Sequence, residues 1–320
     1  MSKALSEQHQ PVMVEEVFQL LQPALMANDA LFVDCTLGLG GHSEYFLKHL
    51  EKLKVVGFDQ DQIALSRAQT RLKDFNNRII FIHSNFERLS QELNNVAINS
   101  VNAFLFDLGV SSIQIDEKSR GFSYLDENKL DMRMDQTQTF SAKELINEWS
   151  EAEISKALFE FGEEKFAKKI AKNIIKKREL APIETTAQLV ALIEKSIPAP
   201  ARRSGGNPAK RTFQALRIAV NQELEVLKKA LADALTLLKP GGRIAVLSYH
   251  SLEDRIVKEL FKSQIAKSEL PRKLPVVESL SQKFRLLNTK PMKPSFQEIE
   301  FNSRSKSAKL RGIEKLDVAA

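Results

Sequence analysis

A chain of 320 residues with 43% hydrophobic and 28% charged residues is long enough for two cores, and this composition excludes a disordered or fibrous protein. Its only cysteine, Cys35, excludes an internal disulfide, and no Cys/His cluster has zinc spacing, so we expect no metal. The formal charge of +6 favours RNA or DNA as a partner but does not establish one.

Neither the start of the chain nor any later segment has the character of an export or membrane sequence. The first ten residues contain no apolar signal region, and no stretch approaches the roughly 20 apolar residues of a membrane span. We therefore expect a cytoplasmic protein that does not contact membranes.

The first third of the chain alternates buried strand-like runs with helical segments. Helices are expected at about 43–53 and, capped by Asp61, up to about Leu72. The predicted strands are 31–36, 54–58, 79–83 and 102–106. Successive strand–helix–strand units imply right-handed crossovers and an open, mostly parallel sheet of the α/β class.

The middle of the chain, from 113 to 211, lacks this alternation and indicates helices and loops. Phe166, Ile170 and Ile174 recur every four residues, and lysines such as Lys168 cover the opposite side, which predicts an amphipathic helix with a basic face. The segment 198–211 is rich in Pro, Gly and basic residues and has no acidic residue, so it is interpreted as a mobile basic loop.

The α/β pattern returns after this segment. A leucine stripe over 224–238 predicts a helix that Pro240-Gly241-Gly242 ends, and 243–248 is a fifth buried strand. A further helix begins near Leu252, and the late strand candidates are 297–301 and 309–313. The predicted organisation is a split domain, 1–112 and 212–320, that carries an inserted all-helical domain, 113–211.

Three predicted strands end in residues suited to bind a nucleoside. Ligands of open parallel sheets bind beyond the carboxyl ends of the strands, where Gly40 and Gly41 would let the backbone approach closely. Asp59 follows the second strand, where a carboxylate can accept ribose hydroxyls, and Asp107 follows the fourth. Phe86, just past the third strand, is placed to cover an adenine or to join the core.

The spacing of the glycines separates two cofactor classes. A dinucleotide fingerprint of the form G-x-G-x-x-G would need glycine where Ser43 stands, so a nicotinamide enzyme is the weaker option. The simplest alternative is that the glycines only make a tight turn and that Asp59 only caps a helix.

The ordered motifs of the whole chain resemble those of the bacterial small-subunit ribosomal RNA cytosine-N4 methyltransferases. The resemblance lies in these blocks: His9–Met13, Asp34–Ser43, Asp107–Ser112, Arg120–Ser123, Leu130–Asp135, Arg211–Arg217, Ser248–Arg255 and Asn302–Arg311. One departure is Cys35, which stands where the family more often has glycine.

The resemblance implies a class I S-adenosylmethionine-dependent methyltransferase fold, Rossmann-like, with an inserted helical domain. It implies methylation of the exocyclic amine of a decoding-site cytosine in 16S ribosomal RNA. The residues implied to bind S-adenosylmethionine are Gly40, Gly41, His42, Asp59, Phe86, Asp107 and Gln114.

Cytosine N4 is a poor nucleophile because its lone pair is delocalised, so acceptors must hold its N–H bonds. Asp107, with Ser111 or Ser112, is the hypothesis for this role, and Asp107 binding only the cofactor is the alternative. His42 and His250 are rival general bases by residue type, and either is equally explained as a structural histidine.

Basic residues outside the sheet core are the candidates for RNA contact, with a solvated charged face as the alternative. They are Lys168, Arg202, Arg203, Lys210, Arg211, Arg304 and Lys306. The expected partner is 16S ribosomal RNA within the small ribosomal subunit, and a homodimer is left open. Two other functions stay open: an NAD-dependent oxidoreductase and a non-catalytic RNA-binding factor for ribosome assembly.

Overall fold

The computed structural model of the chain describes residues 11–203, 207–265 and 283–317. Its contacts divide the chain into two compact units. The sheet unit is formed by Met1–Gly109 and Leu224–Ala320, and the helical unit by Val110–Glu223. The second boundary lies after the one expected at 211/212, because α11 (Ala209–Asn221) packs against α7 (Glu151–Gly162) of the helical unit.

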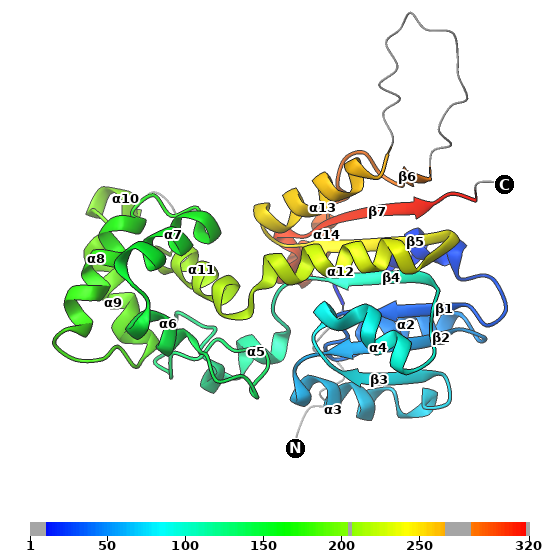
Figure 1. Cartoon of the computed structure of the whole chain (residues 1–320), viewed down its shortest axis with the longest axis horizontal. Coiled ribbons are helices and arrows are strands. Elements are labelled where there is room, and N and C mark those ends of the chain that lie inside the picture. The colour runs from blue at the N-terminus through cyan, green and yellow to red at the C-terminus, as the bar shows by residue number, and fades with distance from the viewer. Residues whose placement is uncertain (1–10, 204–206, 266–282, 318–320) are drawn as a thin grey trace, which may run out of the picture. The chain divides into compact units, whose positions relative to one another are not determined.

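Seven strands of the described residues form one sheet in the order β3-β2-β1-β4-β5-β7-β6 (Figure 1). The five strands from β3 to β5 run parallel, and β7 is antiparallel to both of its neighbours. The strands are β1 (Leu31–Asp34), β2 (Lys54–Asp59), β3 (Ile79–His83), β4 (Val101–Asp107), β5 (Leu238–Ser248), β6 (Phe284–Leu286) and β7 (Lys309–Lys315). This sheet confirms the predicted class I methyltransferase fold.

Both faces of the sheet are covered, which explains why its strands are continuous apolar runs. Neighbouring residues alternate between two cores: Phe32 and Leu105 pack on one face, Val33 and Phe104 on the other. The first core is completed by α1 (Val14–Leu21), α2 (Gly41–His49) and α3 (Gln62–Arg71). The second is completed by α4 (Leu89–Asn95), α12 (Glu223–Leu237) and α13 (Ser251–Ser263), visible in front of the sheet in Figure 1.

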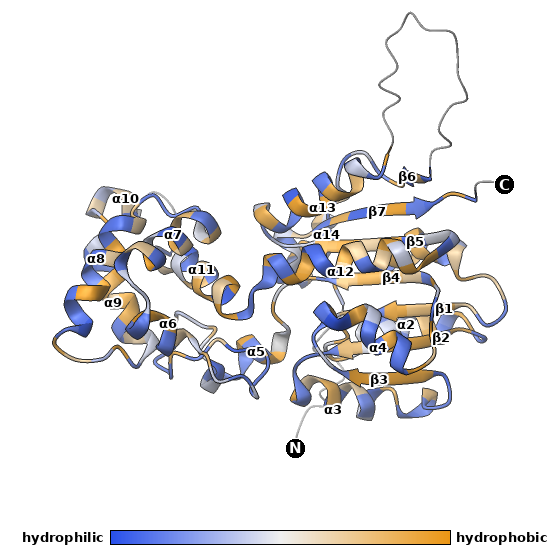
Figure 2. Cartoon of the chain, viewed as in Figure 1, coloured by the Kyte–Doolittle hydropathy of each residue, from blue (hydrophilic) through white to orange (hydrophobic). Residues whose placement is uncertain are grey.

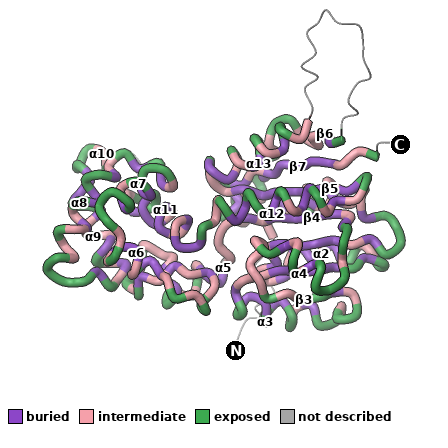
Figure 3. The backbone as a smooth tube through the Cα atoms, viewed as in Figure 1, coloured by how far each residue is buried: buried purple, intermediate pink, exposed green. Residues whose placement is uncertain are grey.

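The hydropathy of the residues matches their burial. The central strands are orange in Figure 2 and purple in Figure 3, whereas the outer sides of the helices are hydrophilic and exposed. The predicted cap of α3 is confirmed, because the Asp61 side chain accepts hydrogen bonds from the amides of Ile63 and Ala64. Short 3-10 turns complete the connections: η1 (Gln22–Ala24), η2 (Lys73–Phe75), η3 (Phe86–Arg88), η4 (Lys118–Arg120) and η5 (Ser303–Ser307).

The helical unit has a core of its own, built from α6 to α9 and α11. Besides α7 and α11, the helices of this unit are α5 (Ser112–Asp116), α6 (Ala142–Glu148), α8 (Ala167–Arg178), α9 (Thr186–Ser196) and α10 (Ala199–Arg203). The predicted basic amphipathic helix is confirmed as α8, where Ile170 and Ile174 are buried and Lys168 is exposed.

Two expectations from the sequence are wrong. The segment 297–301 is not a strand but lies in α14 (Phe296–Phe301), because the Ser295 hydroxyl accepts from the amide of Glu298 and starts a helix. Much of the expected loop 198–211 is helical, because α10 and the start of α11 pack onto the helical unit. The alternation of polar and apolar residues and the content of Pro and Gly reflect only the local preference for a strand or a loop. In both segments tertiary packing overrides that preference.

Replacing Gly162 by alanine tests the close approach of α7 and α11. A Cβ atom at this position would lie 2.6 Å from the backbone oxygen of Arg211, so the helices must move apart. We expect Gly162→Ala to lower the free energy of unfolding by about 1–3 kcal/mol, as overpacking does, measured by urea denaturation. Glu160→Ala, an exposed change on the same helix, is the control and should alter it little. Equal stability of both variants would contradict the assigned packing.

Candidate active site

The first carboxyl group of the site lies at the end of β1. Asp34 is 1% exposed, and it accepts hydrogen bonds from the Ser43 hydroxyl at 2.8 Å and from the Thr36 amide at 3.2 Å. Burial raises the pKa of Asp34 to about 6. The carboxyl group thereby connects the end of β1 to the first turn of α2.

Glycine is required where the loop enters α2. Gly40 has a φ of 77°, and a Cβ atom there would lie 2.8 Å from a methyl carbon of Leu72. At Gly41 the added atom would lie 3.3 Å from Pro11. The loop therefore keeps a bare backbone at the start of the helix, where free amides can face a ligand.

The second carboxyl group, Asp59, lies at the end of β2 and organises the same loop. Its Oδ2 accepts from the Gly38 amide at 2.7 Å and its Oδ1 from the Asp61 amide at 2.8 Å. Burial raises the pKa of Asp59 to about 6. Asp61, not Asp59, caps α3, and each Asp59 oxygen keeps a second lone pair for another donor such as a hydroxyl.

The third carboxyl group, Asp107, lies at the end of β4 between two polar side chains. Its Oδ1 accepts from the Tyr249 hydroxyl at 2.7 Å, and its Oδ2 lies 3.7 Å from Nδ1 of His42. Its amide donates to the Thr36 hydroxyl at 2.7 Å. Burial raises the pKa of Asp107 to about 7, although the Tyr249 hydrogen bond favours the charged form.

His42 is held in one orientation. It is 5% exposed, and its Nε2 lies 3.0 Å from the carbonyl oxygen of Val12. A carbonyl only accepts, so Nε2 carries the hydrogen and Nδ1 faces Asp107 with a lone pair. Burial lowers the pKa of His42, which favours the neutral imidazole. At 3.7 Å, Nδ1 of His42 and Oδ2 of Asp107 are neighbours but lie beyond hydrogen-bond distance.

Tyr249 is the site residue that the sequence analysis did not single out. It follows β5, and its amide donates to the carboxylate of Glu253 at 2.8 Å. Burial, and then the charge of Asp107, raise the pKa of its hydroxyl well above the ordinary value, so it remains a donor. Its position after the fifth parallel strand was the available signal, since that strand ends at the same edge as the other three.

His250, next in the chain, has a structural environment. Its Nδ1 accepts from the Glu253 amide as the cap of α13, and its Nε2 lies 3.0 Å from the Glu253 carboxylate. The bond to the Glu253 amide supports a structural role for His250, while Nε2 is buried without a hydrogen-bond partner among the described residues, so the general-base explanation stays a prediction.

Phe86 lies at the same edge of the sheet, at the start of η3 after β3. Its half-buried ring packs edge to face against Phe106, with 5.8 Å between the ring centres. The ring therefore belongs to the margin of the core and can also border a ligand. Both roles that the sequence allowed for Phe86 are compatible with this position.

Ser111 and Gln114 lie in the helical unit. They form a capping box at the start of α5, in which each side chain accepts from the backbone amide of the other. Gln114 is 4% exposed. The side chain of Ser112 lies outside the described residues.

The candidate RNA-binding residues occupy two regions. Lys168, Arg202, Lys210 and Arg211 are exposed on α8, α10 and α11, while the side chain of Arg203 lies outside the described residues. Arg304 and Lys306 are exposed on η5, in the sheet unit.

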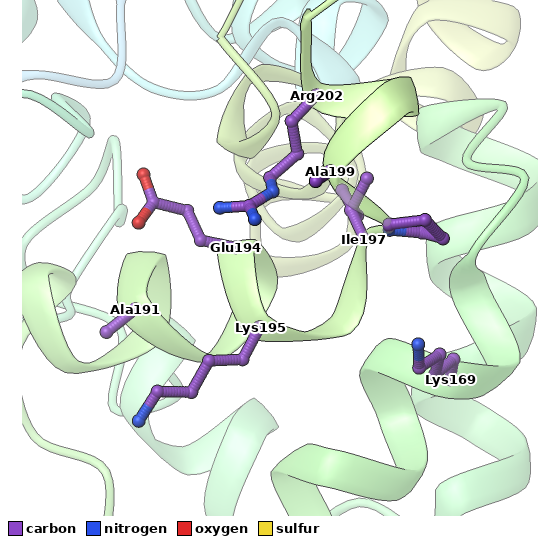
Figure 4. A pocket seen from close by; sticks show the side chains of 8 residues that line it. Lys169, Ala191, Glu194, Lys195, Ile197, Ala199 and Arg202 are labelled. Atoms are coloured by element: carbon purple, nitrogen blue, oxygen red, sulfur yellow. The ribbon is translucent and has the colours of Figure 1, made fainter.

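The helical unit also contains a pocket of about 400 Å³ between α8, α9 and α10. Figure 4 shows the Arg202 side chain extending over it toward Glu194, with Lys169 on the opposite side. Apolar Ile197 and Pro198 line its wall. The pocket therefore combines cationic groups with an apolar surface.

Comparison of the sequence with known proteins identifies the family of the chain. The profile of the MraW methylase family matches residues 6–316. The ribosomal RNA small subunit methyltransferase H of Exiguobacterium sibiricum is 51% identical over 289 residues, which are 90% of this chain and 93% of that protein. None of the described helices is both long and apolar enough to cross a lipid bilayer.

Similar solved structures are more distant. An rRNA methylase from Streptococcus thermophilus has a TM-score of 0.41 at 14% identity, and each chain is covered to 99%. The N-methyltransferase NodS from Bradyrhizobium japonicum has a TM-score of 0.40 at 8% identity, with 95% of this chain and 94% of that chain covered.

The raised pKa of the partly buried Asp107 predicts a pH-dependent effect of Asp107→Asn on stability. The pKa of Asp107 rises from 3.8 to about 7 on folding, so the folded chain retains a proton that the unfolded chain has released between these values. The carboxyl group therefore costs more stability as the pH rises through that window, and asparagine removes this cost. We expect Asp107→Asn to raise the free energy of unfolding more at pH 8 than at pH 5, measured by urea denaturation.

The exposed Asp74→Asn is the control and should change stability similarly at both pH values. A gain from Asp107→Asn that is the same at pH 5 and pH 8 would contradict the partly buried, proton-binding carboxyl group.

Proposed function

The chain belongs to the MraW methylase family, and from this premise we propose that it transfers a methyl group from S-adenosylmethionine to the N4 amine of a cytosine in 16S ribosomal RNA. The observation that carries the proposal is the 51% identity to a small-subunit ribosomal RNA methyltransferase over 90% of the chain. Neither the oxidoreductase nor the non-catalytic assembly factor gains support from this relative.

The residues at the sheet edge fit S-adenosylmethionine. Gly40 and Gly41 leave the loop without side chains, Asp59 keeps lone pairs for the ribose hydroxyls, and Phe86 can border the adenine. His42, Asp107 and Gln114 complete the proposed cofactor-binding set. When bound, S-adenosylmethionine supplies an electrophilic methyl group on a positively charged sulfur.

The role of Asp107 is to orient the target amine and accept its proton. Its pKa of about 7 makes both the carboxylate and the acid accessible near neutral pH, as a general base requires. Tyr249 holds Oδ1, so Oδ2 is the oxygen that can accept from the amine, with the lone pair of His42 Nδ1 beside it. As the new N4–carbon bond forms, the sulfur–methyl bond breaks with its electron pair staying on the sulfur, which leaves as a neutral thioether, and one N4 proton leaves to this carboxylate.

Ser111 and Ser112 are further candidates to accept from the amine. They follow Asp107 closely in the chain, and the Ser111 hydroxyl already accepts from the Gln114 amide. A hydroxyl oxygen has two lone pairs, so this bond leaves Ser111 able to accept once more.

Substrate binding is proposed to use basic residues of both units. Lys168, Arg202, Arg203, Lys210 and Arg211 would contact RNA phosphates from the helical unit, and the pocket beside Arg202 offers cations and an apolar wall together. The target cytosine must be unstacked to reach the sheet edge. We place the substrate at the decoding site of the small ribosomal subunit, hence the enzyme in the cytoplasm, and a homodimer is compatible with this function.

Transfer of tritiated methyl groups to small ribosomal subunits that lack the modification tests the function. We expect the protein to label N4 of one 16S cytosine, identified by mass spectrometry of the RNA. Asp107→Asn should lower kcat roughly 10²- to 10⁴-fold, the range of general-base catalysis. Tyr249→Phe should lower kcat less and move the rising limb of the pH–rate profile upward, because loss of the hydrogen bond raises the pKa of Asp107.

Tyr45→Phe is the control for loss of a hydroxyl elsewhere in the sheet unit, and calorimetry with S-adenosylmethionine reports cofactor binding. Full turnover by Asp107→Asn with unaltered cofactor affinity would exclude both roles of Asp107. A thermal shift with NADH and none with S-adenosylmethionine would overturn the function itself.

Charge reversal tests the helical unit. Changing Arg202, Arg203 and Arg211 to Glu should weaken RNA binding. The slope of log affinity against log salt concentration should become less steep by about 0.7 for each phosphate of single-stranded RNA that the protein no longer neutralises. Lys52→Glu, an exposed change in the sheet unit, is the control. An unchanged salt slope would remove these residues from the RNA-binding surface.

A further inference from the structure

Two aromatic rings of α14 face solvent. Phe296 and Phe301, the first and last residues of this helix, are 90% and 89% exposed, and they are the most exposed large apolar side chains of the described residues. Burial within the sheet unit does not account for either ring. The two rings are five residues apart, so on an α-helix they point about 140° away from each other, and each can contact a different group of a ligand.

Exposed basic residues flank α14 in the chain. Lys290 and Lys293 precede α14, and Arg304 and Lys306 follow it on η5, which packs against α14; all four residues are exposed. Glu300 is the exposed acidic residue of the helix, so positive charge prevails. We call Phe296, Phe301 and these four cations the aromatic–basic surface.

The aromatic–basic surface adjoins the reacting edge of the sheet. Lys309, the first residue of β7, pairs with Ser248 at the carboxyl end of β5, so the chain leading into β7 lies at that edge. The Glu298 carboxylate of α14 accepts from the amide of Met13 at 2.8 Å. The preceding carbonyl, that of Val12, is the group that holds His42.

We propose that Phe296 and Phe301 stack against unpaired bases of the RNA beside the target cytosine, while the four cations hold the adjoining phosphates. The proposal rests on the proposed function, because a cytosine brought to the sheet edge leaves its neighbours unstacked. Every base presents a flat face, so two exposed rings inside a basic surface bind single-stranded RNA without reading its sequence.

The charges favour RNA over a second copy of the chain. In a two-fold dimer through the aromatic–basic surface, the same face of both copies would meet, and four cations would oppose four cations. Like charges brought together oppose such a contact, whereas RNA phosphates neutralise them.

Substitution of both rings separates stacking from apolar contact. Phe296→Leu with Phe301→Leu keeps apolar side chains but removes the aromatic faces, and Phe296→Tyr with Phe301→Tyr keeps the faces. We expect the double leucine variant to bind a short, unpaired, cytosine-rich RNA oligonucleotide about tenfold more weakly or worse, and the double tyrosine variant to remain within about threefold of the parent, by fluorescence anisotropy.

Salt dependence distinguishes the rings from the cations. The double leucine variant should keep the salt slope of the parent, whereas Lys290→Ala with Lys293→Ala should flatten it by about 0.7 for each phosphate that is left without its lysine. Met26→Ala is the control, because Met26 is 64% exposed but precedes β1 at the opposite edge of the sheet. Cofactor affinity by calorimetry should be unchanged in all variants, which reports intact folding.

The proposal would be overturned if the double leucine variant bound RNA with the affinity of the parent and had the same KM for small subunits. Methyl transfer by the parent protein would still support the proposed function in that case. A parent protein that binds RNA but transfers no methyl group would overturn the function instead, and the variants would still decide the stacking. If the rings proved to mediate a dimer in sedimentation velocity, with RNA affinity unaffected by either substitution, the surface would be a contact between copies.

Discussion

Three carboxyl groups, one buried and two partly buried, lie at the carboxyl edge of a parallel sheet, and the chemistry of the site depends on how their charge is tolerated. Asp34, Asp59 and Asp107 end β1, β2 and β4, which are neighbours in the sheet. Burial raises the pKa of each. Each is stabilised by donors of its own: hydroxyls at Asp34 and Asp107, and backbone amides at Asp34 and Asp59.

The different donors leave the carboxyl groups in different environments. Asp59 has both oxygens on amides of the loop region, which shapes the cradle where glycine is required at Gly40. Asp107 has one oxygen held by Tyr249 and the other facing the lone pair of His42. An acceptor with one free oxygen and a pKa near neutrality is suited to take a proton from an amine. The proposed roles in cofactor binding and in proton transfer thus fall on the ends of different strands of one sheet.

The reversed strand β7 begins at this edge of the sheet. Because β7 is antiparallel to β5, the segment before it, with α14 and η5, lies beside the site. The same connection ties Glu298 to Met13, next to the carbonyl that orients His42. RNA held on the outer side of α14, as proposed, would therefore lie near the edge that carries His42.

The sequence by itself determined the strands β1 to β5, the meeting of Gly40, Asp59 and Asp107 at one edge, and the basic face of α8, because these follow from periodicity and from the handedness of crossovers. Tertiary structure decided the rest. Tyr249 lies 142 residues from Asp107, and no local pattern encodes that hydrogen bond. The alternation of polar and apolar residues in 297–301 is compatible with a strand as well as with the helix that Ser295 caps. The expected loop 198–211 became largely helical because α11 packs on α7 at Gly162. Local preference is worth a few tenths of a kcal/mol per residue, and contacts between distant segments outweigh it.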